Sequence, residues 1–184
     1  YMKKESKTIL GLDISTSITG ATIIRAGKII ETFIWDTRNK KNFPTLYEKA
    51  LYIKQGLLSV LVQHEIDEIF IEQSLQSFRS GFSSAKTLST LSRFNGIVSW
   101  LCYENFQIQP QMIAASSARK KAGLSIKRGE NSKEKVLKFI IDKYPDIEIQ
   151  YTKHGNPKPG TLDMCDSIVI ALAGDKLVRE AQTT

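Results

Sequence analysis

TILGLDISTSITGATIIRAGKIIETFIWD, residues 8–36, contains three apolar segments separated by short polar turns. Residues 8–15 are an apolar run that ends in a polar turn, a pattern that predicts a buried strand. Residues 20–26 and 28–36 are rich in β-branched side chains, and Gly27 marks a tight turn between them. Together the three segments predict a meander of antiparallel strands joined by short turns.

Helices and strands alternate after this meander. Pro44 opens an amphipathic helix over residues 45–63, and residues 68–73 are typical of an apolar central strand. The remaining predicted elements are a helix at 84–104, a proline-containing edge strand at 107–114, short helices at 115–121 and 132–143, and a closing apolar helix at 162–180. This order predicts an α/β protein: a mixed five-stranded sheet, three antiparallel strands followed by parallel ones, with helices on both faces. It is the element order of the ribonuclease-H-like fold.

The chain of 184 residues is expected to form a single domain, residues 1–184. Its two cysteines, Cys102 and Cys165, lack the spacing of a metal ribbon and lie in apolar helical patterns, so we expect buried thiols in a reducing, cytoplasmic compartment. We also expect no secretory signal and no membrane partner, because no apolar run approaches the roughly 18 residues that a span requires.

The charge is unevenly distributed. The chain carries 26 Lys and Arg against 19 Asp and Glu, a net charge of +7. Residues 119–138 hold nearly all of this excess, because they include eight basic and two acidic side chains. Such a basic segment favours a polyanionic partner such as nucleic acid.

Four carboxylates stand out by their positions. Asp13 follows an apolar run inside the first strand, and Glu72 does the same in the fourth. A charge inside a buried strand is costly unless something compensates it. Asp163 and Asp166 lie three residues apart at the start of the closing helix, on one face of its first turn. In the predicted sheet the two strands are neighbours, so we expect all four side chains to converge.

Converging carboxylates repel one another unless divalent cations lie between them. Oxygen ligands without histidine or cysteine favour Mg²⁺, with Mn²⁺ as an alternative. Two such ions about 3.5–4 Å apart catalyse phosphodiester hydrolysis by activating water and stabilising the leaving oxygen. The sequence thus predicts a two-metal nuclease in which basic residues hold a polyanionic substrate.

These residues also carry a family resemblance that spans about residues 8–174. GLDISTSITGATII (11–24) resembles the opening motif of the RuvC Holliday-junction resolvases, and IEQSL (71–75) resembles their second motif. SSAKTLSTLSRFNGIVSWLCYE (83–104) is similar to their central helix, and TLDMCDSIVIALA (161–173) to their closing Asp-x-x-Asp helix. The resemblance implies a magnesium-dependent crossover junction endodeoxyribonuclease of DNA recombination and repair, associated with the nucleoid.

The resemblance also implies residue roles. Asp13, Glu72, Asp163 and Asp166 would be the catalytic, metal-binding set. Basic residues that follow the fifth strand would contact the DNA backbone: Arg119 and Lys133 as the best matches, with Lys120, Lys121, Lys127 and Arg128 as helpers. An apolar residue shortly after the glutamate would lie near the junction centre. Leu75, Phe78 and Phe82 are three candidates for that place, and the sequence leaves the choice open.

A homodimer is expected for two reasons. The apolar surface of the predicted helix at 84–104 is wider than one stripe, so it can face both the core and a partner. A four-way junction has two symmetric strands to cut, which suits two identical sites on a twofold axis.

Three alternatives to a junction resolvase can be compared with the sequence, and two of them are disfavoured. The chain could be a related nuclease of the same fold that acts on flaps, forks or RNA, as in YqgF-like or phage branched-DNA nucleases. A nucleotide-binding domain of the actin and sugar-kinase type is disfavoured, because that superfamily clamps ATP between two such domains. A non-catalytic junction-binding scaffold is disfavoured by the carboxylates, which would repel DNA.

Overall fold

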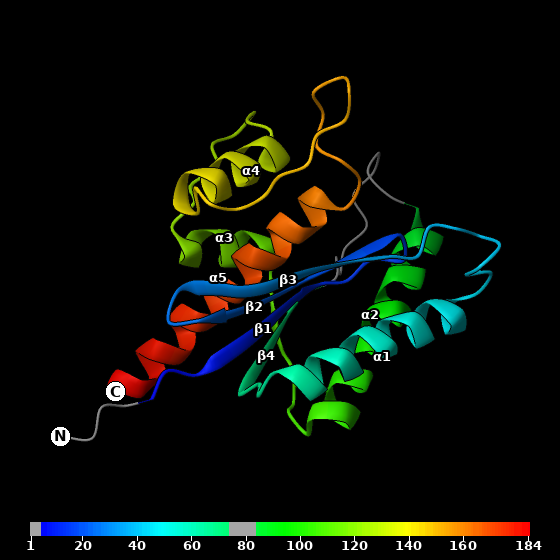
Figure 1. Ribbon diagram of the computed structural model, residues 1–184, viewed down its shortest axis with the longest axis horizontal. Coiled ribbons are helices and arrows are strands. Elements are labelled where there is room, and N and C mark those ends of the chain that lie inside the picture. Colours follow the sequence, from blue (N-terminus) through cyan, green and yellow to red (C-terminus); the bar gives the residue numbers. More distant parts are fainter. Residues whose placement is uncertain (1–4, 74–83) are drawn as a thin grey trace.

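A computed structural model describes residues 5–73 and 84–184 of the chain. Within these residues, five strands form one sheet in the order β3-β2-β1-β4-β5 (Figure 1). β1, β2 and β3 pair antiparallel, whereas β4 pairs parallel to β1 and β5 parallel to β4. The strands are β1 (Thr8–Asp13), β2 (Ile18–Arg25), β3 (Lys28–Asp36), β4 (Glu68–Glu72) and β5 (Gln111–Ile113). The predicted mixed sheet is confirmed, with the proline-adjacent strand β5 at its edge.

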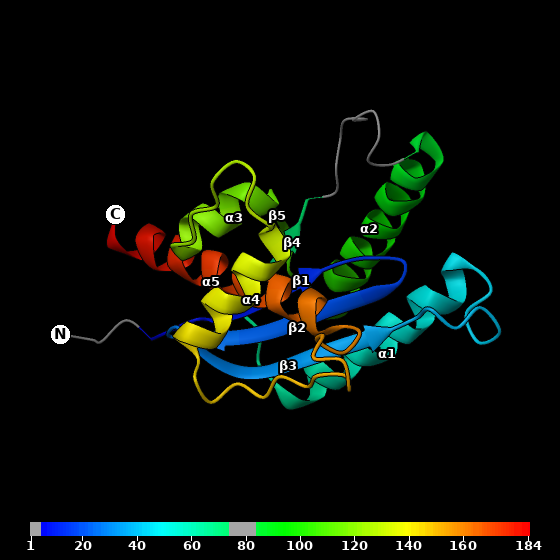
Figure 2. The ribbon, with the colours of Figure 1, turned by 90° about the horizontal axis from the view of Figure 1, so that it is seen from above.

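Helices cover both faces of this sheet, as predicted. α1 and α2 lie on one face, and α5 crosses the other with α3 and α4 beside it (Figures 1 and 2). The helices are α1 (Leu46–Gln63), α2 (Ala85–Phe106), α3 (Ala115–Ala122), α4 (Ser132–Lys143) and α5 (Thr161–Thr183). Thr45 and Glu48 form a capping box at the start of α1, and the Asn131 side chain caps α4. No helix in residues 5–73 and 84–184 is both long and apolar enough to cross a membrane.

The central strands send alternate side chains to two separate apolar cores. Leu12 and Ile71 belong to the core under α1 and α2, and Ile9 and Phe70 belong to the core under α5. Both cysteines are buried, Cys102 in the first core and Cys165 in the second. Because successive side chains of a strand point to opposite faces, this alternation decides which face each remaining residue of β1 and β4 takes.

Glycines bring α5 unusually close to the sheet. A Cβ atom added at Gly11 would lie 2.5 Å from the Ala171 nitrogen, and one added at Gly20 would lie 2.2 Å from the carbonyl oxygen of Asp163. The backbones of α5 and of β1 and β2 can therefore touch only where the side chain is a single hydrogen atom. The start of α5 is consequently seated on β2.

A buried carboxylate secures the turn between β2 and β3. Asp175 of α5 is 3% exposed and accepts a hydrogen bond from the backbone nitrogen of Gly27 at 3.1 Å. Arg179 contacts the same carboxylate at 2.9 Å, and the Tyr144 hydroxyl donates to the Gly27 carbonyl at 2.8 Å. The turn needs this glycine, because Gly27 has φ +74°. These contacts tie the far end of the meander to α5.

Candidate active site

Asp13 and Glu72 end two neighbouring parallel strands. Leu12 and Ile71 are the last residues that pair between β1 and β4, so Asp13 and Glu72 follow side by side and face α5 by strand alternation. Burial raises the pKa of Asp13 well above its usual range, and the charge of Glu72 and a hydrogen bond with its carboxyl raise it further. The two carboxyl groups therefore meet at the carboxyl edge of the sheet.

Asp163 and Asp166 reach this edge from the first turns of α5. Gly20 is the register partner of Asp13 in β2, and the Asp163 carbonyl packs on that glycine. Burial raises the pKa of Asp163, and Asp166 adds to the rise. The charge of Asp166 also raises the pKa of Asp13. Asp13 thus feels the charges of both Glu72 and Asp166, and Asp163 feels the charge of Asp166.

Lys133, in the first turn of α4, supplies a positive charge to these carboxylates. Its ammonium forms an ion pair with Asp166, whose side chain is 17% exposed. Burial alone would lower the pKa of Lys133, but Asp166, Asp13 and Asp163 together raise it. The sequence predicted a DNA-contacting role for this lysine; the structure places it against the acidic cluster itself.

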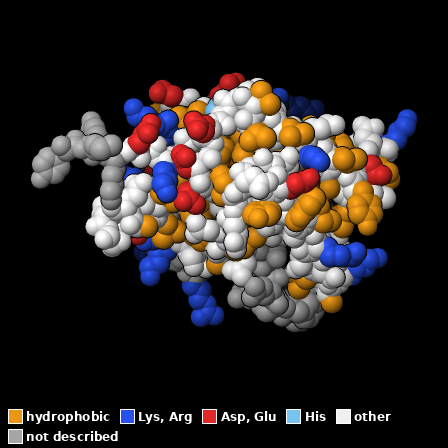
Figure 3. Space-filling model, turned by 90° about the horizontal axis from the view of Figure 1, so that it is seen from below, with side chains coloured by type: hydrophobic (Ala, Val, Ile, Leu, Met, Phe, Trp, Pro, Cys, Tyr) orange, Lys and Arg blue, Asp and Glu red, His pale blue; other side chains and the backbone are white. Residues whose placement is uncertain are grey.

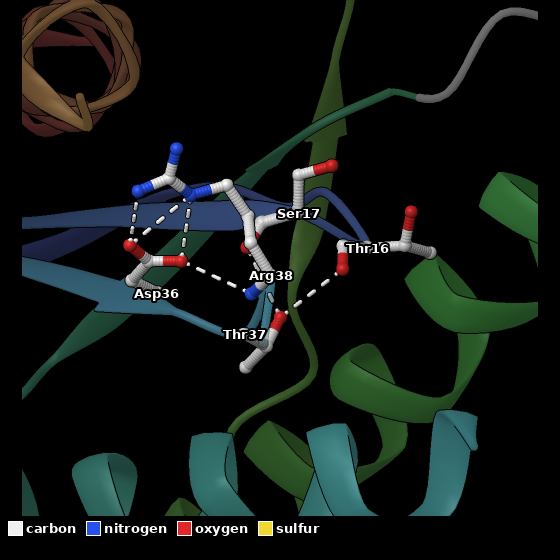
Figure 4. Close-up of polar contacts among 5 residues, drawn as sticks. All are labelled: Thr16, Ser17, Asp36, Thr37 and Arg38. Atoms are coloured by element: carbon white, nitrogen blue, oxygen red, sulfur yellow. Dashed lines mark hydrogen bonds and ion pairs between the residues drawn. The ribbon is translucent and has the colours of Figure 1, made fainter. Parts of the chain in front are cut away.

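Side-chain hydrogen bonds to backbone carbonyls hold the end of β4 and the loop after β1. The Asn95 side-chain amide donates to the Glu72 carbonyl at 3.1 Å. In the loop after β1, the buried Thr19 hydroxyl donates to the Ser15 carbonyl at 3.2 Å. Thr37 donates its hydroxyl to the carbonyls of Thr16 and Ser17, both at 3.1 Å (Figure 4). Neither Asn95 nor Thr37 belongs to a recognisable motif, so the sequence gives no signal that they support the site.

The basic segment lies on α3, α4 and the loop between them. Arg119 and Lys120 line a surface pocket of about 520 Å³ together with Ser116 and Leu124. Lys120, Lys127 and Arg128 are exposed, whereas Lys121 is held by Glu180 of α5 at 2.8 Å. Leu75, Phe78 and Phe82 lie outside the described residues.

The carboxylates offer the ligand atoms that a divalent cation would need. Their donors are oxygen atoms only, the kind that Mg²⁺ and Mn²⁺ prefer. Asp13 and Glu72 form a half-buried pair whose repulsion a cation would relieve. In the part of the chain that the structure describes, no three His, Cys, Asp or Glu side chains come together at metal-binding spacing. The donor chemistry therefore fits an ion held by Asp13 and Glu72, and the four-carboxylate metal set stays a prediction.

Comparisons with known proteins rest on structure alone. No protein-family model matches the sequence, and no curated protein does. Thermus thermophilus RuvC in complex with a Holliday junction substrate superposes with a TM-score of 0.69 at 14% identity, over 95% of this chain and 96% of that one. A second Thermus thermophilus RuvC structure gives 0.65 at 16% identity, with the same shares covered.

The yeast mitochondrial Holliday junction resolvase Ydc2 is also similar. Its TM-score is 0.59 at 14% identity, over 97% of this chain and 82% of Ydc2. The likeness extends over nearly the whole chain and includes the sheet order and the helices on both faces. From its five-stranded sheet to its closing helix, this chain therefore has the ribonuclease-H-like fold of RuvC and Ydc2.

Proposed function

We propose that the protein is a metal-dependent endonuclease that resolves four-way DNA junctions. One observation carries the proposal: Asp13, Glu72 and Asp166 come from distant parts of the chain, and the charges of Glu72 and Asp166 both raise the pKa of Asp13. The chain shares its fold with RuvC, solved in complex with a Holliday junction substrate, and with the Holliday junction resolvase Ydc2. A cluster of like charges is destabilising for folding, so its retention favours a catalytic role.

Each group of residues has a distinct task in this proposal. Asp13 and Glu72 would hold a divalent cation, with Asp163 and Asp166 completing the set. A bound divalent cation supplies the Lewis acidity for attack of water on a phosphodiester. Lys133 pairs with Asp166, and its positive charge would limit the repulsion that an incoming phosphate meets. Arg119 and Lys120, on α3, would bind the DNA backbone away from the cut.

The same proposal includes a homodimer. The outer surfaces of α1 and α2 expose large apolar side chains, among them Leu51 at 61%, Val62 at 85%, Trp100 at 59% and Tyr103 at 51%. Seen from the side of these helices, apolar side chains are spread over the surface (Figure 3). Pairing two copies through this face would cover apolar area and provide two cutting sites for a symmetric junction. Light scattering at micromolar concentration should report twice the chain mass, and a monomer would contradict the pairing.

A nicking assay tests the enzymatic proposal. A mobile four-way junction, labelled on each strand in turn, is incubated with and without Mg²⁺, and the cuts are mapped. We expect paired symmetric nicks only with Mg²⁺. Asp13→Asn and Glu72→Gln should abolish nicking while preserving junction binding in a gel-shift assay. Flap, fork and RNA substrates run in parallel would reveal the related nuclease activities if the junction is not preferred.

Continued cutting by Asp13→Asn would remove this carboxylate from the catalytic set. Loss of junction binding in the same variant would assign it to folding or recognition instead. Both outcomes are read against the thermal unfolding of each variant.

A further inference from the structure

An arginine that the sequence analysis did not select lies at the end of β3. The Asp36 carboxylate accepts hydrogen bonds from Arg38 Nε at 3.0 and 3.2 Å and from Nη2 at 2.7 Å (Figure 4). The Arg38 side chain is 51% exposed. An exposed pair of this kind contributes little to stability. Its main physical consequence is to hold the guanidinium plane in one orientation.

The neighbouring residue anchors this arrangement to the loop that follows Asp13. Thr37 is 1% exposed, its hydroxyl donates to Thr16 and Ser17, and its backbone nitrogen donates to the Ser17 carbonyl at 2.8 Å. The Arg38 backbone is therefore attached to the same loop that leaves the catalytic strand. Displacement of the Arg38 backbone from this loop would require these hydrogen bonds to break.

The end of β3 also lies beside the start of α5. Ile34 pairs with Gly20, on which the Asp163 carbonyl packs, and a Cβ at Gly160 would lie 2.4 Å from Ile34 Cγ2. Asp36 is two residues further along β3. Consistent with this placement, the Arg38 and Asp163 charges act on each other. The acidic cluster thus has two cationic neighbours from different elements, Lys133 of α4 and Arg38.

Lys133 and Arg38 differ in which of their hydrogen-bond donors are engaged by a carboxylate. The Lys133 ammonium is paired with Asp166. Asp36 accepts hydrogen bonds from Nε and Nη2 of Arg38. The two N–H groups of Nη1 take no part in that ion pair. A planar guanidinium that is oriented by Asp36, has donors that Asp36 does not engage and is exposed beside carboxylates is suited to a phosphate oxygen.

We propose that Arg38 binds a backbone phosphate of the DNA strand that enters the carboxylate site, and that Asp36 is its positioning residue. The inference rests on the proposed nuclease function and adds a contact on the β3 side of the site, apart from the basic segment at 119–138. Recognition is of the phosphodiester backbone, so it is independent of base sequence.

Arg38→Gln is the decisive variant, and Arg25→Gln is its matched control. Arg25 has similar exposure, 46%, and pairs with Glu5 at the opposite end of β2. Junction binding is measured by fluorescence anisotropy over a range of salt concentrations with Ca²⁺ in place of Mg²⁺. For Arg38→Gln we expect roughly tenfold weaker binding at low salt, and a plot of log K against log salt flattened by about one unit. Arg25→Gln should bind like the wild type.

Two further variants separate charge from orientation. Arg38→Lys keeps the charge but loses the planar fork, so its salt dependence should match that of the wild type while its kcat falls below the wild-type value. Asp36→Asn keeps Arg38 charged but weakens its orientation, so kcat should fall more than junction affinity. A merely structural role would instead lower Tm and leave the salt dependence unchanged.

The outcomes distinguish the two proposals. If the wild type binds and nicks the junction, and Arg38→Gln matches Arg25→Gln in affinity and salt dependence, the Arg38 assignment is wrong and the nuclease proposal stands. If the wild type binds no branched DNA, both proposals fail together.

Discussion

Replacing Gly20 with alanine tests whether close contact between α5 and β2 builds the site. The new Cβ would lie 2.2 Å from the Asp163 carbonyl oxygen, whereas ordinary van der Waals contact begins at 3.4 Å. Helix or strand must therefore shift by about 1.2 Å. Both contacting groups are backbone atoms, which cannot rotate away as a side chain would. Overpacking of this kind costs about 2–3 kcal/mol, and Tm should fall by roughly 5–10 °C for a chain of this size.

The same shift should have a larger effect on catalysis than on folding. Asp163 and Asp166 would move relative to Asp13, and a misplacement of about 1 Å at a reacting centre can cost roughly 100-fold in rate. We therefore expect Gly20→Ala to fold, to bind the four-way junction, and to nick it about 100-fold more slowly. Thermal unfolding by circular dichroism and single-turnover nicking on labelled junctions measure the two effects separately.

Gly96→Ala is the matched control for stability. Gly96 lies in α2, and a Cβ added there would meet nothing within 4 Å. Alanine should raise helix stability by about 0.5–1 kcal/mol, so Tm should rise rather than fall. If Gly20→Ala left both Tm and the nicking rate unchanged, the close seating of α5 on β2 would not be what positions the carboxylates.

Three further predictions concern charge and burial. Asp13→Asn should raise Tm in EDTA, because a neutral amide removes the desolvated charge beside Glu72; added Mg²⁺ should stabilise the wild type and not this variant, as differential scanning fluorimetry can show. Burial raises the pKa of both Cys102 and Cys165 to about 12, so at pH 8 the native thiols should react with Ellman's reagent at least about 100-fold more slowly than in guanidinium chloride; rapid labelling of the native protein would contradict their burial. Asp175→Ala should lower the free energy of unfolding in urea by about 1–3 kcal/mol, since the Gly27 nitrogen and Arg179 lose their acceptor, while the exposed Asp142→Ala should have little effect.

Local pattern was enough to predict the secondary structure. Apolar alternation and turn residues in 8–36 predicted the meander, and helical spacing predicted α1 and α2, because both signals are short-range. The mixed sheet followed from the order of elements. The juxtaposition of Asp13 and Glu72 could also be anticipated, because both residues end strands that neighbour each other in that sheet order.

Other parts of the site could not be anticipated from local pattern. Arg38 follows an ordinary strand end, and no sequence signal says that Asp36 orients it or that Asp163 lies near. The family resemblance selected Lys133 as a DNA contact, and nothing in the sequence indicated that its ammonium pairs with Asp166. Gly20 appeared only as part of a motif, and its contact with the Asp163 carbonyl shows why a side chain there is excluded.

The amino-acid sequence by itself determined the order of strands and helices, the basic segment and the identity of the acidic residues. Only the tertiary structure decided which charges meet, because helix packing angle and depth depend on contacts between residues far apart in the chain. The separation of Asp13 from Asp166 is set by how closely α5 approaches β1 and β2, and that approach is set by glycines at two points on the sheet. Coulomb interactions change steeply over such short distances. A displacement of about an ångström at this contact would therefore decide whether the carboxylates are close enough to act together.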